Sequence, residues 1–463
     1  MNSFKPMLLT SLKSYDRAQF AKDVTAGIIV AIIALPLSIA LALASGVGPE
    51  AGIFTAIVAG FVISALGGSC VQIAGPTAAF ATIVAGIVAR DGLEGLMTAT
   101  ILAGVFLIIM GFCHFGSLIK FIPYTITTGF TSGIAVTIVI GQLKDFCGVT
   151  YPDGVKPIET MEKLKAFAEN FSTISPDALI VGGVSLAILI VSPLIFKKIP
   201  GSLIAVIVGI LMVQFLPLHV STIGNLYTIS NALPTLHLPV FDMKLIQSAI
   251  PNAFTIAVLA AIESLLSCVV ADGMINSKHR SDTELIAQGA GNIASALFGG
   301  IPATGAIART AANIKNGGRT PVAGMVHSIT LVIVLVVLMP FAGMIPMPTI
   351  AAILFLVAYN MCQWRTFVHL VRTAPKSDII VLFTTFVLTV VFDLVVAIEI
   401  GMVLACLLFI KRMSEETHAD SWVYVDDDSP AVMNICRSCR WKSVYTRSQD
   451  RSSLARRMRL STL

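Results

Sequence analysis

The sequence predicts an all-α, polytopic membrane protein. Of its 463 residues, 56% are hydrophobic and only 12% are charged, whereas ordinary soluble domains are about 25% charged. Its apolar runs are long enough to cross a bilayer, which takes roughly 20 residues for each helix. The third observation is a pair of runs broken by Gly and Pro at matching places in the two halves of the chain.

Apolar runs separated by Gly, Pro or charged residues give fourteen predicted segments. They are approximately 24–44, 51–67, 72–89, 96–113, 120–141, 177–196, 201–217, 248–271, 284–299, 302–315, 321–340, 347–362, 378–394 and 396–411. The predicted organisation is a cytoplasmic N-terminus at 1–23, a first membrane repeat at 24–217, a second at 248–411 and a cytoplasmic tail at 412–463.

The basic residues agree with this count. Sixteen lie in stretches predicted to be cytoplasmic, six in outside loops and eight in the tail beyond Pro430, which is the asymmetry of the positive-inside rule. Of the 31 basic residues, this leaves Arg309 as the one inside a segment. A cation at membrane depth is costly and by default marks a binding or transport site.

The third and tenth segments are interrupted at corresponding places. Ala74-Gly75-Pro76-Thr77 opens one, and Ile301-Pro302-Ala303-Thr304-Gly305 opens the other. Each is the third of seven segments, and because seven is odd, the second half enters the membrane from the opposite side. The sequence therefore predicts seven-plus-seven inverted repeats, with the broken pair marking the binding site.

Both prolines can start a half-helix or the turn that leads into one, because proline lacks an N–H that the first turn leaves unpaired anyway. Inverted repeats then aim two helix N-termini, each with free N–H groups and roughly half a positive charge, at one place. Arg309 adds a full charge, and Thr77 and Thr304 can add hydroxyl donors. Small residues leave room for a ligand, namely Ala78, Ala79, Gly305, Ala306 and Ala308. The predicted site binds an anion; close helix packing through small residues is the alternative.

Glu263 is an acid in the middle of segment eight. As a structural group it stays ionised and pairs with Arg309 or with helix N–H donors. As a functional group it takes up a proton when substrate binds, because burial favours the neutral form. Ser267, one turn further along, either packs between helices or helps to bind a cation. The sequence leaves proton and sodium coupling both open.

Several stretches, in their order along the chain, resemble the SulP family of inorganic-anion transporters. They are Leu35–Ala40 with Gly48-Pro49, Ile73–Thr77, Ile122–Gly133, Glu284–Asn292, Ile301–Arg309 with Gly317–Thr320, and Asp393–Gly401. Each motif alone is weak, whereas the ordered set is highly specific. The resemblance covers about residues 10–425.

This resemblance implies the fold of the uracil permeases, in which a core domain moves against a gate domain as an elevator, and it implies a homodimer. The anion is expected between the N-termini of segments three and ten. The implied binding residues are Thr77, Ala78 and Ala79 on one side, Ala306, Ile307, Ala308 and Arg309 on the other, and Leu37 and Leu41 of segment one.

The chain departs from the family pattern at three places. Glu263 stands where sodium-coupled bicarbonate relatives have aspartate, which favours protons as the coupling ion. Thr77 replaces a phenylalanine of several relatives. Relatives usually continue into a cytoplasmic STAS domain, whereas here a linker-like stretch, Ser421–Asp428, leads into a basic, serine-rich tail expected to be mostly disordered. A missing or truncated STAS domain is one interpretation, and a polybasic tail that binds the membrane surface is the other.

These observations predict a secondary transporter of small anions such as sulfate, bicarbonate or a dicarboxylate, with both termini cytoplasmic, in the inner (plasma) membrane. Proton-coupled uptake is the first interpretation. A sodium-coupled bicarbonate carrier or exchanger, and an uncoupled anion conductance, are the alternatives. The sequence holds no Walker motif, zinc ligand set or nucleophile elbow. We therefore expect no enzyme, no cofactor or metal, and no nucleic-acid partner.

Overall fold

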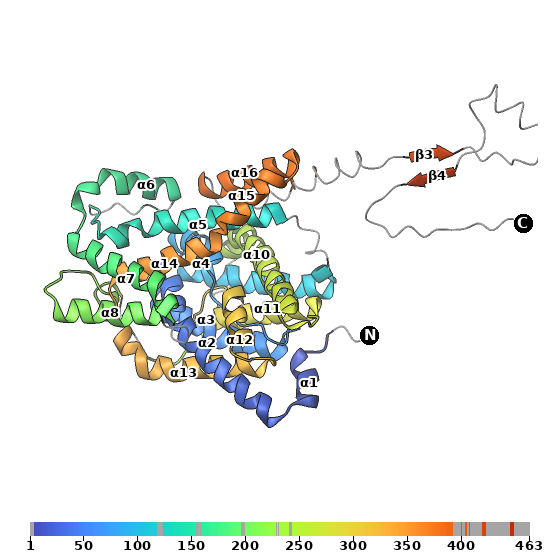
Figure 1. The fold of residues 1–463 in the computed structure, drawn as a ribbon, viewed down its shortest axis with the longest axis horizontal. Coiled ribbons are helices and arrows are strands. Elements are labelled where there is room, and N and C mark those ends of the chain that lie inside the picture. The colour runs from blue at the N-terminus through green and yellow to red at the C-terminus, as the bar shows by residue number, and fades with distance from the viewer. Residues whose placement is uncertain are drawn as a thin grey trace, which may run out of the picture. The chain divides into compact units, whose positions relative to one another are not determined.

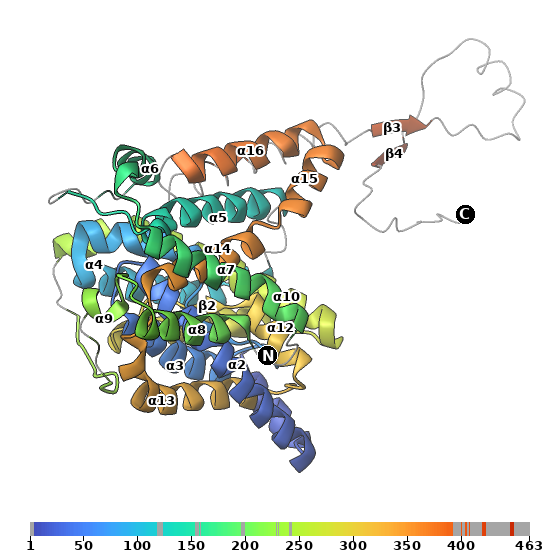
Figure 2. The same cartoon turned by 60° about the vertical axis from the view of Figure 1, so that its left-hand side comes forward.

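The computed structural model describes residues 4–117, 124–152, 159–195, 200–227, 231–239 and 243–391, a few single positions, and two short strands beyond residue 400. It divides into two units, Met1–Ile400 and Gly401–Leu463. In the described part of the first unit, helices surround a ladder of two very short strands (Figures 1 and 2). The second unit is described only by its two strands.

Seven helices and the ladder pack together, and we call them the core group. The helices are α2 (Arg17–Ala44), α3 (Pro49–Leu66), α4 (Ala78–Phe112), α10 (Met243–Ile275), α11 (Ser281–Leu297), α12 (Ile307–Lys315) and α13 (Val322–Ala342). Within this group α4 packs on α10 and α11, and α13 packs on α2 and α3. The packing of α3 on α13 repeats, with the halves of the chain exchanged, the packing of α11 on α4. This exchange is what two repeats related by a twofold axis require.

The remaining long helices pack with one another, and we call them the gate group. They are α5 (Tyr124–Cys147), α7 (Pro176–Ile195), α8 (Gly201–Phe215), α14 (Met347–Cys362) and α16 (Lys376–Val391), with the shorter α6 (Thr160–Glu169) and α15 (Trp364–Thr373) beside them. Both views show α5 and α16 together on the side opposite α2 and α13 (Figures 1 and 2). The two groups meet chiefly where α2 packs on α8 and α14 and where α4 packs on α5.

Glycines let helices of the core group approach closely. Gly104 of α4 faces Gly289 of α11, and a Cβ atom on Gly104 would lie 2.6 Å from the Gly289 carbonyl oxygen. Small residues at such crossings are typical of membrane helices, which gain stability from close van der Waals contact. Gly92 has another role, since its φ of 71° breaks α4 into two helical stretches. These two stretches correspond to predicted segments three and four.

The other described elements are short. They are α1 (Met7–Ser11), the 3₁₀ turns η1 (Leu12–Ser14) and η3 (Phe171–Thr173), α9 (Ile223–Leu226), and strands β1 (Ala74–Gly75), β2 (Thr304–Gly305), β3 (Ala419–Trp422) and β4 (Tyr445–Ser448). In the second unit β3 and β4 pair antiparallel, with Trp422 opposite Tyr445. Most of predicted segment fourteen and most of the tail lie outside the described residues.

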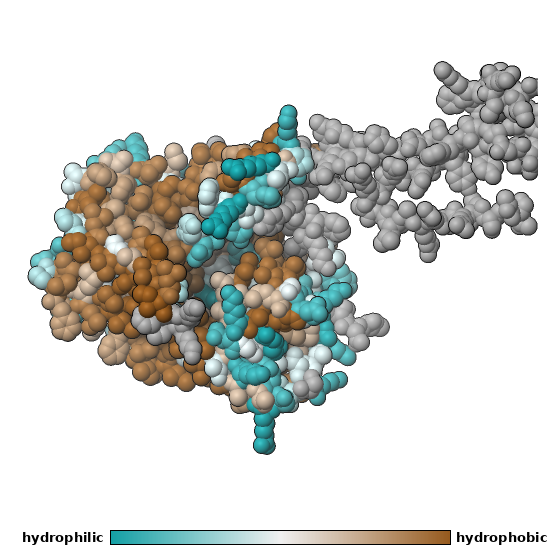
Figure 3. All heavy atoms as spheres, viewed as in Figure 1, coloured by the Kyte–Doolittle hydropathy of each residue, from teal (hydrophilic) through white to brown (hydrophobic). Residues whose placement is uncertain are grey.

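The outer surface of the first unit is apolar where a bilayer would contact it. Eight helices among the described residues are long and apolar enough to cross a membrane. Large apolar side chains such as Leu194 and Ile333 are exposed. Figure 3 shows one face largely covered by hydrophobic side chains, with hydrophilic ones gathered near α1 and the start of α2 and around α15. An apolar surface of this extent fits a lipid environment.

Candidate functional site

The two broken segments meet inside the core group. β1 and β2 pair antiparallel, with Ala74 opposite Gly305 and Gly75 opposite Thr304. The backbone N–H of Ala306 extends the ladder by donating to the Ile73 carbonyl at 2.9 Å. Each strand leads directly into a helix, so α4 and α12 begin at adjacent points. The structure thus brings together the two segments that the sequence predicted to form the site.

Both helix N-termini lack a side-chain cap. Thr77 and Ala306 are the N-cap residues of α4 and α12, and neither side chain accepts a hydrogen bond from its own helix. The first N–H groups of an α-helix have no partner within the helix, and together they carry roughly half a positive charge. Two such ends at the same ladder can bind an anion with backbone donors alone.

Arg309 lies beneath the first N-terminus. Its side chain is 2% exposed, and Nη2 donates to the Pro76 carbonyl oxygen at 3.0 Å. The absence of a side chain at Gly75 makes the approach possible, since a Cβ atom there would overlap Nη1 of Arg309. Neither Nε nor Nη1 has a hydrogen-bond partner among the described residues. The guanidinium charge of Arg309, a residue of α12, therefore lies next to the start of α4.

Glu263 contacts the first segment and forms no ion pair with Arg309 within the described structure. Its carboxylate accepts a hydrogen bond from the Thr77 hydroxyl at 2.9 Å. Arg309 instead uses the Pro76 carbonyl. The interpretation in which Glu263 pairs with Arg309 is therefore not the arrangement seen. Acid and base thus contact different groups of Pro76-Thr77.

The neighbouring Ser264 contacts the second segment. Its Oγ lies 2.6 Å from the Thr304 hydroxyl and accepts the Gly305 N–H at 3.1 Å. Thr304 also donates to the Ala260 carbonyl at 3.2 Å. Ser267, one turn later, donates to the Thr310 hydroxyl at 3.4 Å. One helix, α10, thus holds both broken segments through successive residues.

Side chains satisfy the irregular backbone before β2, as required at membrane depth. The Asn292 amide donates to the Ala303 carbonyl at 2.9 Å and accepts the Ala303 N–H at 2.8 Å. The Thr55 hydroxyl accepts the Ile301 N–H at 2.7 Å. Sequence reasoning did not assign these residues to the site. Asn292 lies in one of the stretches that carried the family resemblance, which was the available signal.

The predicted lining residues differ in exposure. Ile307 and Ala308 at the start of α12 are exposed, and Leu37, Thr77 and Ala306 are half-buried. The others are buried, namely Leu41, Ala78, Ala79, Thr304 and Gly305. An approaching ligand would therefore meet the N-terminus of α12 more directly than that of α4.

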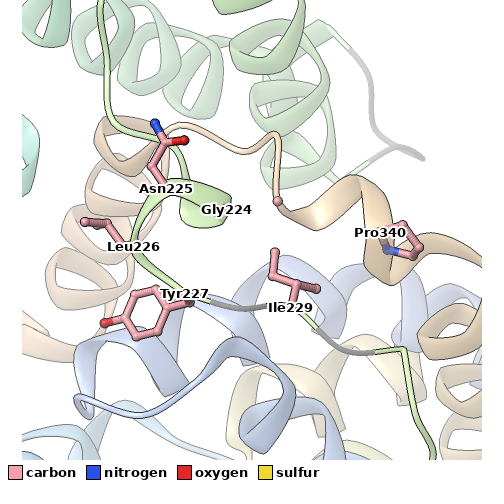
Figure 4. A pocket seen from close by; sticks show the side chains of 7 residues that line it. Gly224, Asn225, Leu226, Tyr227, Ile229 and Pro340 are labelled. Carbon is pink, nitrogen blue, oxygen red and sulfur yellow. The ribbon is translucent and has the colours of Figure 1, made fainter.

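A separate cleft of about 390 Å³ lies elsewhere in the first unit. The loop around α9 and the end of α13 line it, with Tyr227, Ile229 and Pro340 among the lining side chains (Figure 4). None of the predicted site residues lines this cleft. It contains no charged side chain, and we assign no chemistry to it.

Comparisons with known proteins agree with these observations. A family model described as the sulfate permease family matches residues 20–385. The chain is 42% identical over 414 residues to the putative sulfate transporter YvdB of Bacillus subtilis, covering 88% of this chain and 76% of that protein. It is 35% identical over 403 residues to the bicarbonate transporter BicA of Picosynechococcus, covering 85% and 70%.

Solved structures are similar as well. The transmembrane domain of a cyanobacterial bicarbonate transporter, BicA, superposes with a TM-score of 0.74 at 30% identity, covering 83% of this chain and 98% of that one. Murine Slc26a9, an anion transporter in its inward-facing state, gives a TM-score of 0.81 at 19% identity, covering 91% and 73%. At that identity the second likeness concerns the fold alone.

Proposed function

The chain belongs to the sulfate permease family, and from this premise we propose that it is a secondary active transporter of small anions in the inner (plasma) membrane. The predicted fold class is confirmed, because its structural neighbours are transmembrane domains with the seven-plus-seven inverted-repeat fold. The named relatives are transporters, and the chain is not an enzyme. The count of fourteen spans stays a prediction.

The observation that carries the proposal is the buried Arg309 beside two uncapped helix N-termini. A permanent buried cation is destabilising unless an opposite charge is supplied, and Glu263 does not supply it. A bound anion would do so and would also accept the free N–H groups. Sulfate and bicarbonate, which two relatives are named for, both present several acceptor oxygens to such a site.

For coupling we propose a proton carried by Glu263. Glu263 is half-buried, and its carboxylate accepts a hydrogen bond from Thr77 at the N-cap of α4. Protonation would remove a negative charge from beside the anion, so anion and proton would bind together. Ser267 would serve a cation less well, because its hydroxyl hydrogen is directed to Thr310. Sodium coupling, exchange and uncoupled conductance remain as the alternatives.

For the mechanism we propose an elevator in a homodimer, with both termini cytoplasmic. All residues of the candidate site belong to the core group, including Leu37 on α2, Glu263 on α10 and Arg309 on α12. Because the core group packs extensively within itself and meets the gate group along few helices, it can move as one body past the gate group.

Uptake into proteoliposomes tests the function. Purified protein is reconstituted and offered labelled bicarbonate, sulfate and a dicarboxylate, each with no gradient, a proton gradient or a sodium gradient. We expect saturable uptake of at least one anion, accelerated by an inward proton gradient and accompanied by acidification of the lumen. Non-saturating current without countertransport would instead support a conductance.

Glu263→Gln is the matched coupling variant, because it keeps the shape of the side chain and an acceptor for Thr77. We expect it to transport the anion at a rate that no longer responds to the proton gradient. If only a sodium gradient accelerates uptake by the wild-type protein, sodium and not the proton is the coupling ion. Uptake of the Gln variant that still follows the proton gradient would exclude Glu263 as the proton carrier.

A further inference from the structure

Two buried polar side chains of α12, Thr310 and Asn313, follow Arg309 in the sequence. Each is 1% exposed, and because they are three residues apart they lie on one face of the helix. Polar groups buried at membrane depth are destabilising unless they form hydrogen bonds. The partners of these two side chains therefore show which neighbour this face of α12 fits.

Both side chains contact the run that leads into β1. The Thr310 hydroxyl accepts the Ile73 N–H at 3.1 Å, and the Asn313 amide donates to the Val71 carbonyl at 2.9 Å. On the other side of Ile73, its carbonyl accepts the Ala306 N–H at 2.9 Å. The first broken segment is thus bound in antiparallel order by the second one and then by the helix that follows it.

These side chains take over because the backbone of α12 cannot continue the ladder. From Ile307 onward the chain is helical, so its N–H and C=O groups point along the helix axis and not towards a neighbouring strand. Without Thr310 the buried Ile73 N–H would lose its acceptor, and without Asn313 the Val71 carbonyl would lose its donor. Buried backbone groups are almost always paired. The two side chains therefore fix how α12 is rotated about its axis and where it lies along the first segment.

The position of Arg309 depends on this fit. Arg309 precedes Thr310 by one residue, which is about 100° around the helix, and its described hydrogen bond is the one from Nη2 to the Pro76 carbonyl. A Cβ atom on Gly75 would overlap Nη1, so the guanidinium has little free space beside β1. Because Arg309 belongs to α12 and its acceptor belongs to the first segment, rotation or sliding of α12 against that segment displaces the guanidinium.

We propose that Thr310 and Asn313 are positioning residues for Arg309, which hold α12 in register with the first broken segment and so hold the guanidinium at the start of α4. Both act through Arg309 and do not touch the anion. The inference rests on the proposed role of Arg309 in binding the anion. Affinity for the anion then depends on hydrogen bonds between α12 and the run before β1.

The test measures KM and maximal rate for labelled bicarbonate and sulfate in proteoliposomes. Thr310→Val keeps the shape of the side chain and removes the acceptor of the Ile73 N–H. We expect KM to rise about five- to tenfold, equivalent to about 1 to 1.4 kcal/mol, with maximal rate changed less than about twofold. Thr310→Ser keeps the hydroxyl, and we expect its KM to stay within about twofold of the wild-type value.

Asn313→Leu tests the second contact and separates it from α10. Thr310 also accepts a hydrogen bond from Ser267 of α10 at 3.4 Å, whereas the described hydrogen bond of the Asn313 side chain goes to Val71. We therefore expect Asn313→Leu to raise KM about as much as Thr310→Val does. A KM increase in Thr310→Val alone would assign the effect to the contact with Ser267 and would overturn the proposal.

Thr349→Val is the matched control. Thr349 is 0% exposed and shares a buried hydrogen bond with Ser185 at 2.9 Å within the gate group, so the same substitution removes a buried contact away from α12. We expect it to lower the melting temperature without raising KM. Equal KM increases in Thr349→Val and Thr310→Val, or a KM in Thr310→Ser as high as in Thr310→Val, would contradict a specific role for Thr310.

A double-mutant cycle separates this proposal from the function on which it rests. On an Arg309→Ala background, Thr310→Val should add less than about twofold to KM, because residues that act through one another are not additive. A full five- to tenfold further increase would show that Thr310 acts independently of Arg309 and would overturn the proposal. Unchanged KM in Arg309→Ala itself would instead refute the proposed anion site.

Discussion

The two broken segments are alike in backbone and different in chemistry. β1 and β2 pair residue for residue, and each leads into a helix whose N-terminus has no side-chain cap. The first contributes no charge and continues into the 35-residue α4. The second leads into the nine-residue α12, which carries Arg309.

The difference teaches how the site divides its tasks. The first segment supplies a buried N-terminus whose Pro76 carbonyl receives Arg309 and whose Thr77 contacts Glu263. The second supplies the cation and the more exposed N-terminus, with Ile307 and Ala308 at the surface. Charge and access thus come from one half of the chain, and the link to the coupling acid comes from the other.

The largest expected effect comes from adding a methyl group to each strand. In Gly75→Ala the new Cβ atom takes the place of Arg309 Nη1 and displaces the guanidinium. We expect anion affinity to fall about ten- to hundredfold, because overpacking costs about 1–3 kcal/mol at this contact. Isothermal titration with the transported anion measures the loss of affinity.

Gly305→Ala is the matched variant on the other strand. Its Cβ atom meets the Gln72 amide instead, so the expected effect is mainly a lower melting temperature. Equal losses of anion affinity in both variants would contradict the different roles assigned to the two strands.

Substitution of the two threonines, Thr77 and Thr304, should have different effects on stability and on coupling. Thr304 is buried and bonded to Ser264 and Ala260. We expect Thr304→Val to destabilise the protein by about 2 kcal/mol, since each hydrogen bond contributes about 1 kcal/mol. Thr77→Val loses only its contact with Glu263. We expect it to keep stability within about 0.5 kcal/mol and to alter the response of uptake to a proton gradient. Thermal unfolding and gradient-driven uptake, run on both variants, measure the two effects, and a stability loss in Thr77→Val with unchanged coupling would contradict this division.

The smallest expected effect concerns access. Cysteine at Ala308 is predicted to react with a small charged thiol reagent, because this position is exposed, and the transported anion should slow the reaction. In Ala79→Cys the new cysteine is buried, since Ala79 is 0% exposed on α4. We expect this variant to be labelled no faster than the wild-type protein, in which only the native cysteines react. Mass spectrometry of the labelled peptides reports both rates. Labelling at Ala79 that matches Ala308 would mean that the two N-termini are equally accessible.

Much of the site could be predicted because its main features are visible in the linear sequence. A cation at membrane depth and a pair of runs broken by Gly and Pro at matching places each have few explanations. They identified Arg309, Pro76 and Pro302, and the structure brings their segments into one ladder. The ends of one helix were also predicted, since α14 begins and ends where the apolar run 347–362 does. Other ends were not, since α10 (Met243–Ile275) extends beyond the predicted 248–271 on both sides.

The partners of these residues could not be predicted in the same way. Whether Arg309 contacts Glu263 or a carbonyl depends on how the helices pack around β1, and the sequence left that choice open. The sequence did not assign Ser264 or Asn292 to the site, yet they satisfy the backbone around β2.

Anion binding to Arg309→Ala tests the central claim most directly. The purified wild-type protein, Arg309→Ala and Arg309→Lys are each titrated with the transported anion. Arg309→Lys is the control that keeps the charge, and the melting temperatures of all three proteins are compared to exclude unfolding. We predict that the alanine variant loses affinity by at least about thirtyfold, as expected when a buried charge loses its partner at a cost of roughly 2–5 kcal/mol. The lysine variant should lie between the two. Wild-type affinity in Arg309→Ala would contradict an anion site built on this residue.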